Sequence, residues 1–326
     1  MAPGAEALPI EPIPLAEIEA ARERLKGSIM RTPLVRLGVE DAPAEVYLKL
    51  ENLQPMGSFK VRGAGNAMAL ADPGQVAEGL WTASAGNMAQ AVAWHARRLG
   101  VPCTVVVPDT AASTKVDAVR RLGASIEEVP FGEWFELFRT RRRDGLTGLF
   151  VHPFSDAAVM AGNGTIGLEI LEELPDVDAV LIPFGGGGLS CGIASALRAL
   201  KPKVRIYAAE VTTGAPLAAS LADGRPVEVP FTPSFVDGAG GPVVLPEMFA
   251  VASKLFDGSL VVEPAEVAQA VRIMAERNRV IAEGAGALPV AAALQGLAGG
   301  GNVVCVVSGG NIDSAKLSTI LGGDVP

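Results

Sequence analysis

The chain has 326 residues, a formal net charge of −9 at pH 7 and 49% hydrophobic residues. This length favours two domains or one large α/β unit, and the negative charge disfavours nucleic acid as a partner. No apolar run is long enough to cross a bilayer, and residues 1–20 lack the basic and apolar regions of a secretory signal. The three cysteines form no CxxC pair, which fits a reducing compartment. We therefore expect a cytoplasmic protein with no membrane partner.

Short apolar runs alternate with longer helical patterns along most of the chain. This alternation predicts parallel sheets covered by helices on both faces, an open doubly wound α/β architecture. The predicted strands are 46–50, 80–83, 103–107, 125–129, 179–183, 205–209, 260–263 and 303–307. The predicted helices are 87–99, 113–122, 165–173, 189–200 and 264–278. Such sheets bind ligands beyond the carboxyl ends of their strands, so the loops that follow strands are the candidate sites.

The first candidate segment, ENLQPMGSFKVRGA at Glu51–Ala64, places a lysine at the start of a helix. Pro55 and Gly57 end the preceding strand, and Ser58 can cap the helix that follows. Lys60 then lies in the first turn, where the positive end of the helix dipole and burial should lower the pKa of its amine. Such a lysine is a potential nucleophile. Taken alone, however, the pattern is better explained by a surface lysine.

Three loops after predicted strands are rich in small and polar residues. One of them consists of Gly185, Gly186, Gly187 and Gly188. Because a helix begins at Leu189, the N–H groups of this loop can converge where the helix dipole favours an anion, which predicts a phosphate site. A simple turn would need only one glycine. The other two loops, Ser84–Gln90 and Ser308–Asn311, supply hydroxyl, amide and backbone donors.

Two familiar kinds of motif are incomplete. The stretch Gly162–Gly167 matches GxGxxG, but the residues before it do not form a convincing strand, and Asp178 precedes the next strand instead of ending it. A dinucleotide site is therefore not predicted. His95 and His152 belong to no metal-binding or triad motif. We expect Lys, Asp, Glu or Tyr to move protons instead.

In combination, these segments resemble the fold-type II pyridoxal phosphate (PLP) enzymes, in the branch of the threonine and serine dehydratases and serine racemase. The motifs follow the family's order over nearly the whole chain: SFKVRGA, SAGNMAQ, AGNGTIGLE, the four glycines, EGAGA at Glu283–Ala287 and SGGN. The resemblance implies two open doubly wound parallel-sheet domains of the tryptophan synthase β type. A large PLP-binding domain would comprise residues 1–52 and 154–326, and a small mobile domain residues 53–153. It also implies a homodimer.

The resemblance further implies a role for each matching residue. Lys60 should carry PLP as an imine and act as the catalytic base, with Phe59 packed beside the ring. Asn87 should hold the 3′ oxygen of the cofactor, Ser308 should face its pyridine nitrogen, and Glu283 should belong to the same site. The cofactor phosphate is expected on Gly185, Gly186, Gly187, Gly188 and Leu189, and the amino acid substrate on Ser84, Ala85, Gly86, Asn87 and Met88.

The reaction implied is the α,β-elimination of water from a β-hydroxy amino acid, which gives a 2-oxo acid and ammonia. A neutral hydroxyl at Ser308 leaves the pyridine ring a weaker electron sink, and this favours loss of a β leaving group over transamination. Threonine, serine, 3-hydroxyaspartate and bulkier 3-hydroxy amino acids all stay open as substrates. The alternatives are a serine or aspartate racemase, a synthase that adds a nucleophile, and a non-catalytic binder of PLP or a phosphometabolite.

The chain departs from the family pattern at several positions. Ala85 stands where family racemases have serine, and since alanine cannot donate a proton, racemisation is disfavoured. Met88 replaces a common histidine, which suggests a more apolar substrate pocket. No carboxylate follows Glu210 until Asp223, so no metal is expected. The chain also ends soon after SGGN, so we expect no regulatory domain and no feedback by isoleucine.

Overall fold

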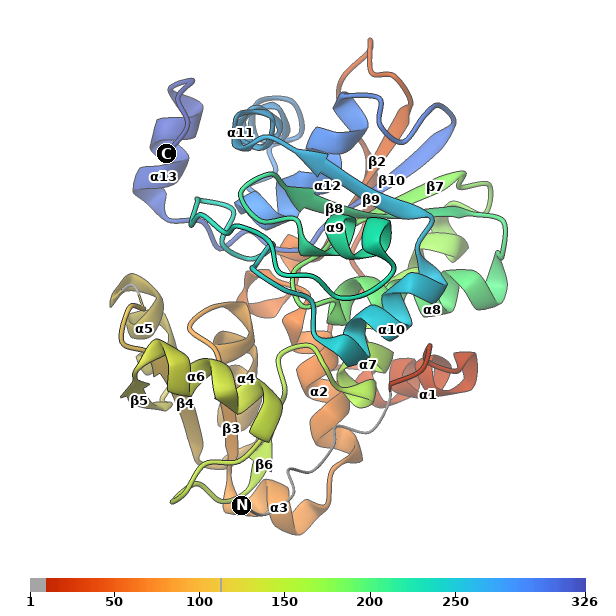
Figure 1. Ribbon diagram of the computed structural model, residues 1–326. Coiled ribbons are helices and arrows are strands. Elements are labelled where there is room, and N and C mark those ends of the chain that lie inside the picture. The colour runs from red at the N-terminus through yellow and green to blue at the C-terminus, as the bar shows by residue number, and fades with distance from the viewer. Residues whose placement is uncertain (1–9, 112) are drawn as a thin grey trace.

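The computed structural model describes residues 10–111 and 113–326 and contains two separate sheets (Figure 1). The larger sheet has the strand order β1-β2-β10-β7-β8-β9, and the smaller one β5-β4-β3-β6. The large-sheet strands are β1 Leu34–Arg36, β2 Glu45–Leu50, β7 Ala179–Pro183, β8 Arg205–Val211, β9 Gly258–Val262 and β10 Asn302–Val307. The small-sheet strands are β3 Leu80–Ala83, β4 Cys103–Pro108, β5 Ser125–Val129 and β6 Leu149–Phe150. All neighbours pair in parallel except β1 with β2, which confirms the prediction of two parallel-sheet units.

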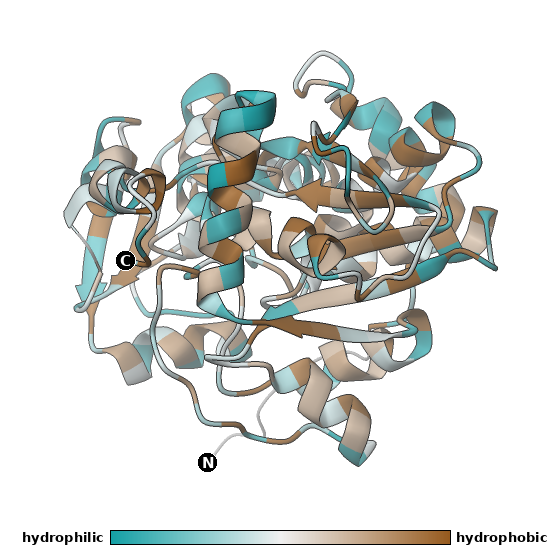
Figure 2. Ribbon diagram, turned by 90° about the horizontal axis from the view of Figure 1, so that it is seen from above, coloured by the Kyte–Doolittle hydropathy of each residue, from teal (hydrophilic) through white to brown (hydrophobic). Residues whose placement is uncertain are grey.

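Helices cover both faces of the sheets, with their apolar sides turned inward (Figure 2). They are α1 Leu15–Leu25, α2 Lys60–Leu70, α3 Pro73–Glu78, α4 Asn87–Leu99, α5 Ser113–Arg120, α6 Phe131–Thr140, α7 Ala157–Glu173, α8 Gly188–Leu200, α9 Pro216–Asp223, α10 Pro246–Leu255, α11 Pro264–Ile273, α12 Gly284–Leu294 and α13 Ser314–Leu321. Short 3-10 turns at Glu51–Leu53 and Pro55–Gly57 connect β2 to α2, and a π turn at Met274–Asn278 follows α11.

The core lies on both sides of the large sheet, because alternate side chains of each strand enter different clusters. Val180 and Ile182 of β7 pack into one cluster, while Ala179 and Leu181 pack into the other. The first cluster also holds residues of α7 and α8, and the second holds residues of α11 and α12. A strand buried on both faces is apolar at every position, which explains why these strands could be predicted as short apolar runs.

The GxGxxG stretch lies inside a helix, which corrects the expected start of that helix at residue 165. Helix α7 begins at Ala157, where the Asp156 side chain accepts a hydrogen bond from the Val159 N–H. A methyl group on Gly162 would lie 2.5 Å from the carbonyl oxygen of Arg62 in α2, and one on Gly164 would lie 2.9 Å from that of Gly192 in α8. These glycines allow three helices to pack closely, and they form no loop for a dinucleotide.

The expected cap of the lysine-bearing helix is wrong. The residue before α2 is Phe59, and it makes no side-chain capping bond. Ser58 is extended, with φ −160° and ψ 160°, and its backbone pairs instead with Gly309 in an isolated bridge. This bridge holds the start of α2 against the loop that follows β10.

Each sheet has a topological switch point, and the two points lie at the same cavity. In the large sheet the chain passes from β7 to β8 to β9 in one direction, while β10 lies on the other side of β7. In the small sheet it passes from β3 to β4 to β5, while β6 lies on the other side of β3. Loops that leave neighbouring strands in opposite directions open a crevice between them. The loops after β7, β10, β3 and β6 all contribute to the cavity described below.

The structure bears on only part of what the sequence predicts about a secretory signal and a membrane-spanning segment. Residues 1–9, which carry much of the expectation about a secretory signal, lie outside the described residues. Within the two described ranges, no helix has both the length and the apolar composition of a membrane-spanning segment.

Candidate functional site

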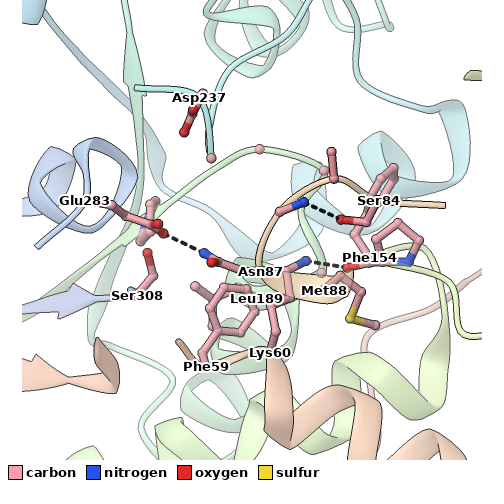
Figure 3. A pocket seen from close by; sticks show the side chains of 18 of the residues that line it. Phe59, Lys60, Ser84, Asn87, Met88, Phe154, Leu189, Asp237, Glu283 and Ser308 are labelled. Carbon is pink, nitrogen blue, oxygen red and sulfur yellow. Dashed lines mark hydrogen bonds between the residues drawn. The ribbon is translucent and has the colours of Figure 1, made fainter. Parts of the chain in front are cut away.

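A cavity of about 310 Å³ lies between the two sheets (Figure 3). Every site residue predicted from the sequence lines it. These residues are Phe59, Lys60, Ser84, Ala85, Gly86, Asn87, Met88, Gly185, Gly186, Gly187, Gly188, Leu189, Glu283 and Ser308. They come from segments that are far apart in the sequence, and their contacts indicate what each one can do.

Lys60 is the first residue of α2 and points its amine into the cavity. Its Nζ donates a hydrogen bond to the carbonyl oxygen of Pro153 at 2.5 Å and lies 5.1 Å from the centre of the Phe59 ring. The residue as a whole is only partly buried, but its amine lies deep in the protein. Burial lowers the pKa of Lys60 to about 8, against the opposing charge of Glu283. A neutral amine, the form that attacks a carbonyl or takes a proton, is therefore available near neutral pH.

The segment that receives the Lys60 amine is held by His152, whose role was not predicted. Burial lowers the pKa of His152 to about 3, with a further contribution from the charge of Arg141. The neutral ring accepts the N–H groups of Phe154 at 3.1 Å and Ser155 at 2.8 Å on Nδ1. Since Nδ1 accepts, Nε2 carries the proton and donates to the carbonyl oxygen of Phe138 at 3.0 Å. His152 is thus structural, and it positions the Pro153 carbonyl beside Lys60.

The four-glycine loop joins β7 to α8 and forms one wall of the cavity. Gly187 has φ +89°, a conformation that side chains disfavour. A methyl group on Gly186 would lie 2.3 Å from the ring of Phe154, and one on Gly188 would lie 2.6 Å from the carbonyl oxygen of Phe154. Packing against Phe154 therefore requires glycine at positions 186 and 188, whether or not a ligand binds to the loop. The first turn of α8 leaves N–H groups without partners inside the helix, and the helix dipole favours an anion beside them, so the loop fits a phosphate group.

A second helix N-terminus faces the cavity at the SAGN loop. The Gly86 N–H donates to the Ser84 hydroxyl oxygen at 3.2 Å, and α4 starts at the next residue, Asn87. This loop can receive a carboxylate for the same electrostatic reason as the glycine loop. Met88 also lines the cavity, but its side chain is only 1% exposed and packs in a hydrophobic cluster beside the smaller sheet. It therefore forms part of an apolar wall.

Glu283, the residue before α12, connects the SAGN loop to the segments around the larger sheet. Its Oε1 accepts a hydrogen bond from Asn87 Nδ2 at 2.8 Å (Figure 3). Burial raises the pKa of Glu283 to about 7 and the charge of Asp237 adds to this effect, while Asn87, Lys115 and Lys60 oppose it. The buried residue Ser308 follows the end of β10 and lines the same cavity. The site thus combines an amine, a carboxyl group and a hydroxyl group.

One ion pair at the cavity was missed by sequence reasoning. Nζ of Lys115 in α5 lies 2.5 Å from a carboxylate oxygen of Asp237, which belongs to the loop between α9 and α10. Both residues line the cavity, and about 40% of each side chain is exposed. No local pattern separates Lys115 from an ordinary surface lysine of an amphipathic helix, and Asp237 lies in a long loop outside every recognised motif. Phe131 and Trp134 of α6 are further lining residues that were not predicted.

Glu210 is held by hydrogen bonds at the end of β8. Its carboxylate accepts the N–H groups of Leu217 at 2.9 Å and Ala218 at 2.7 Å and the hydroxyl of Ser259 at 2.6 Å. Burial raises the pKa of Glu210, and these three donors oppose the shift. Over residues 10–111 and 113–326, no three His, Cys, Asp or Glu side chains come together as a metal site.

Comparisons with known proteins agree on one family. The model of the "Pyridoxal-phosphate dependent enzyme" family matches residues 25–309. An L-threonine ammonia-lyase from Geobacter sulfurreducens is 41% identical over 321 residues, which cover 95% of this chain and 78% of the relative. The solved structure of maize serine racemase is similar with a TM-score of 0.85 at 30% identity, covering 94% of this chain and 96% of that one. The processed form of threonine deaminase isoform 2 from Solanum lycopersicum gives a TM-score of 0.84 at 31% identity, covering 99% of this chain and 98% of that one.

Proposed function

Because the chain belongs to the family of pyridoxal-phosphate dependent enzymes, we propose that its cavity eliminates water from L-threonine to give a 2-oxo acid and ammonia. The observation that carries this proposal is the buried amine of Lys60 in a cavity that also holds the four-glycine loop and Ser308. Relatives named L-threonine ammonia-lyase or L-threonine dehydratase, 38–41% identical over 95% of this chain, support the same reaction.

The lining residues fit the cofactor. Gly185–Leu189 would hold its phosphate at the N-terminus of α8, Asn87 its 3′ oxygen and Ser308 its pyridine nitrogen, with Phe59 and Glu283 completing the site. When bound, PLP supplies an electron sink for the negative charge that forms at the substrate α-carbon. Lys60 would carry the cofactor covalently through its ε-amine and, once released from it, would take the α-proton.

The substrate would bind on the small-domain side of the cavity. The N-terminus of α4 and the Ser84–Met88 loop can receive its carboxylate. Ala85 offers no proton on this wall, which argues against racemisation even though serine racemases are among the similar structures. The apolar wall at Met88 suits the methyl group of threonine better than a second carboxylate.

Three further features are proposals about the whole molecule. We propose that residues 53–153 move as a small domain that closes on the substrate and excludes water.

A homodimer is also proposed. Met30, Leu53 and Ile281 are exposed apolar side chains. Hydrogen bonds from the Met30 N–H to Gln54 and from Asn52 to the Ile281 carbonyl hold their segments near one another, and we propose that a second copy covers these side chains. A cytoplasmic location fits three unpaired cysteines.

A panel of β-hydroxy amino acids tests the proposed reaction. We expect ammonia and 2-oxo acid from L-threonine, a slower reaction with L-serine, little with 3-hydroxyaspartate, and no inversion at the α-carbon. Ammonia release and enantiomer formation are measured on the same samples. Inversion of serine or aspartate without ammonia would establish a racemase, and a wild-type protein that binds PLP but transforms no member of the panel would contradict the proposal.

The lowered pKa of Lys60 predicts how cofactor incorporation depends on pH. Since burial lowers this pKa from 10.5 to about 8, the reactive neutral amine accumulates as the pH rises towards 8. The rate at which apoenzyme takes up PLP should therefore increase up to about pH 8 and level off above it. Absorbance at fixed PLP concentration measures the rate, with N-acetyl-lysine as a control for the ionisation of PLP itself. A rate that keeps rising to pH 10, as with the control amine, would contradict the shift.

A further inference from the structure

Asn311, the last residue of the SGGN loop, connects three segments around the cavity. Its Nδ2 donates to the carbonyl oxygen of Met56 at 2.7 Å and to Oδ1 of Asn87 at 2.8 Å. Met56 lies in the turn before Lys60, and Asn87 begins α4 in the small domain. Asn311 ends the SGGN motif but was given no role from the sequence, and it does not line the cavity. It nevertheless contacts the turn that precedes Lys60 and a residue that faces the cavity.

These contacts fix which way the Asn87 amide points. A main-chain carbonyl only accepts hydrogen bonds, so the group of Asn311 that faces Met56 must be its NH2. The second hydrogen of this NH2 points at Asn87, which must therefore present its oxygen. The NH2 of Asn87 consequently faces the other way and donates to Glu283 at 2.8 Å. The Met56 carbonyl, acting through Asn311, and the Glu283 carboxylate thus fix the same orientation of Asn87 from the two ends of its amide.

The Asn311 side chain is itself held in place by the backbone. The N–H of Gly310 donates to the carbonyl oxygen of Gly57 at 2.9 Å. Gly57 has φ +68°, and a methyl group on it would lie 2.7 Å from Oδ1 of Asn311. Met56 has φ +64°, an unfavourable conformation for a side chain of its size. The hydrogen bond from Asn311 helps to hold this turn in the conformation that leads into α2.

We propose that Asn311 is a positioning residue that keeps an N–H of Asn87, and not its carbonyl oxygen, directed at the 3′ oxygen of the cofactor. The inference rests on the proposed function, in which Asn87 holds that oxygen. The NH2 of Asn87 has two hydrogens, and Glu283 takes one of them, so the other is available to a ligand. If Asn311 no longer donates, the Asn87 amide is held at one end only, by Glu283. It is then freer to rotate, and its carbonyl oxygen would repel the 3′ oxygen of the cofactor.

A double-mutant cycle tests this role with cofactor binding as the readout. Apoenzyme of Asn311→Ala should bind PLP about tenfold more weakly than wild type, as expected for loss of one hydrogen bond to a charged oxygen, and the holoenzyme absorbance band should shift. In an Asn87→Ala background, the same change should cause almost no further loss, because Asn311 acts through Asn87. Asn311→Asp keeps the shape but removes both donors, and should weaken binding in the same direction.

Asn52→Ala is the matched control. Asn52 also donates from Nδ2 to a main-chain carbonyl, that of Ile281 at 3.1 Å, but it does not contact Asn87, so PLP affinity should stay within about twofold of wild type. Melting of each apoenzyme checks folding. The inference is overturned if folded Asn311→Ala and Asn311→Asp bind PLP with the affinity and spectrum of wild type, or if their losses add fully to that of Asn87→Ala. Failure of wild type to bind PLP would overturn the proposed function instead.

Discussion

Replacing Lys60 with alanine should lower 2-oxo acid formation from L-threonine by at least about 1,000-fold, since a positioned base alone contributes on the order of 10²–10⁴. Under the proposed function, the alanine variant would lose both the covalent attachment point and the base. The cavity has no equivalent substitute, because the other lysine that lines it, Lys115, is paired with Asp237 at 2.5 Å. Steady-state rates and the absorbance of the purified protein measure the two losses separately.

Two variants make this result specific. Lys60→Arg keeps a positive charge but has no amine that can be freed of its proton, and it should be as inactive as Lys60→Ala. Lys115→Ala removes a lysine from the same cavity and should still attach the cofactor covalently. Folding of all three is compared by circular dichroism. A folded Lys60→Ala protein with a wild-type turnover rate would rule out Lys60 as the base.

Replacing Arg62 with leucine should destabilise the protein by about 3–5 kcal/mol, the usual loss when one partner of a buried ion pair is removed. Arg62 is fully buried two residues after Lys60. Its guanidinium donates to both carboxylate oxygens of Glu51 at 2.8 Å and to those of Glu169 at 2.6 and 3.0 Å. Lys49 lies 2.7 Å from Glu169. The cluster joins α2 to α7 and to the end of β2, so it also anchors the helix that begins with Lys60.

The size of this loss should depend on pH. Burial opposes the change, but Arg62 and Lys49 hold the pKa of Glu169 below its ordinary value of 4.5. Because the folded state lowers this pKa, the ionised Glu169 carboxylate stabilises the folded state above pH 4.5, and this stabilisation is lost as the pH falls and the carboxylate takes up a proton. The difference between wild type and Arg62→Leu should therefore be smaller at pH 4 than at pH 7 in urea unfolding.

Arg22→Leu is the control for Arg62→Leu. Arg22 pairs with Glu172 at 2.6 Å, but about 40% of each side chain is exposed, so its loss should cost less than about 1 kcal/mol. Equal midpoints of urea unfolding for Arg62→Leu and Arg22→Leu would show that the buried cluster adds no stability beyond that of a surface pair.

The strands and their following loops could be predicted because the local sequence determines them. A strand covered on both faces is a short apolar run, and glycine and asparagine after such a run mark a turn with exposed donors. The predicted strand 179–183 and the actual β7 are identical for this reason. In contrast, β1 and β6 have only three and two residues, too few for a hydrophobic period to be recognised.

Contacts between distant segments could not be predicted. The relay from Met56 through Asn311 and Asn87 to Glu283 joins residues up to 255 positions apart. A sequence window of about 11–18 residues, the length in which a local pattern is recognised, contains only one of these residues at a time. Arg62 belongs to a recognised motif, but its partners Glu51 and Glu169 lie on other elements. The start of α7 was missed because Gly162 and Gly164 suggest a loop, whereas close packing against α2 and α8 is what requires them.

A crystal structure of the holoenzyme tests the central claim most directly. The account predicts continuous density from Nζ of Lys60 to the cofactor, with the phosphate group within hydrogen-bond distance of the N–H groups of Gly185–Leu189. The account would be contradicted by a Lys60 amine that has no covalent bond to the cofactor and still donates a hydrogen bond to the Pro153 carbonyl, while the cofactor occupies another part of the molecule.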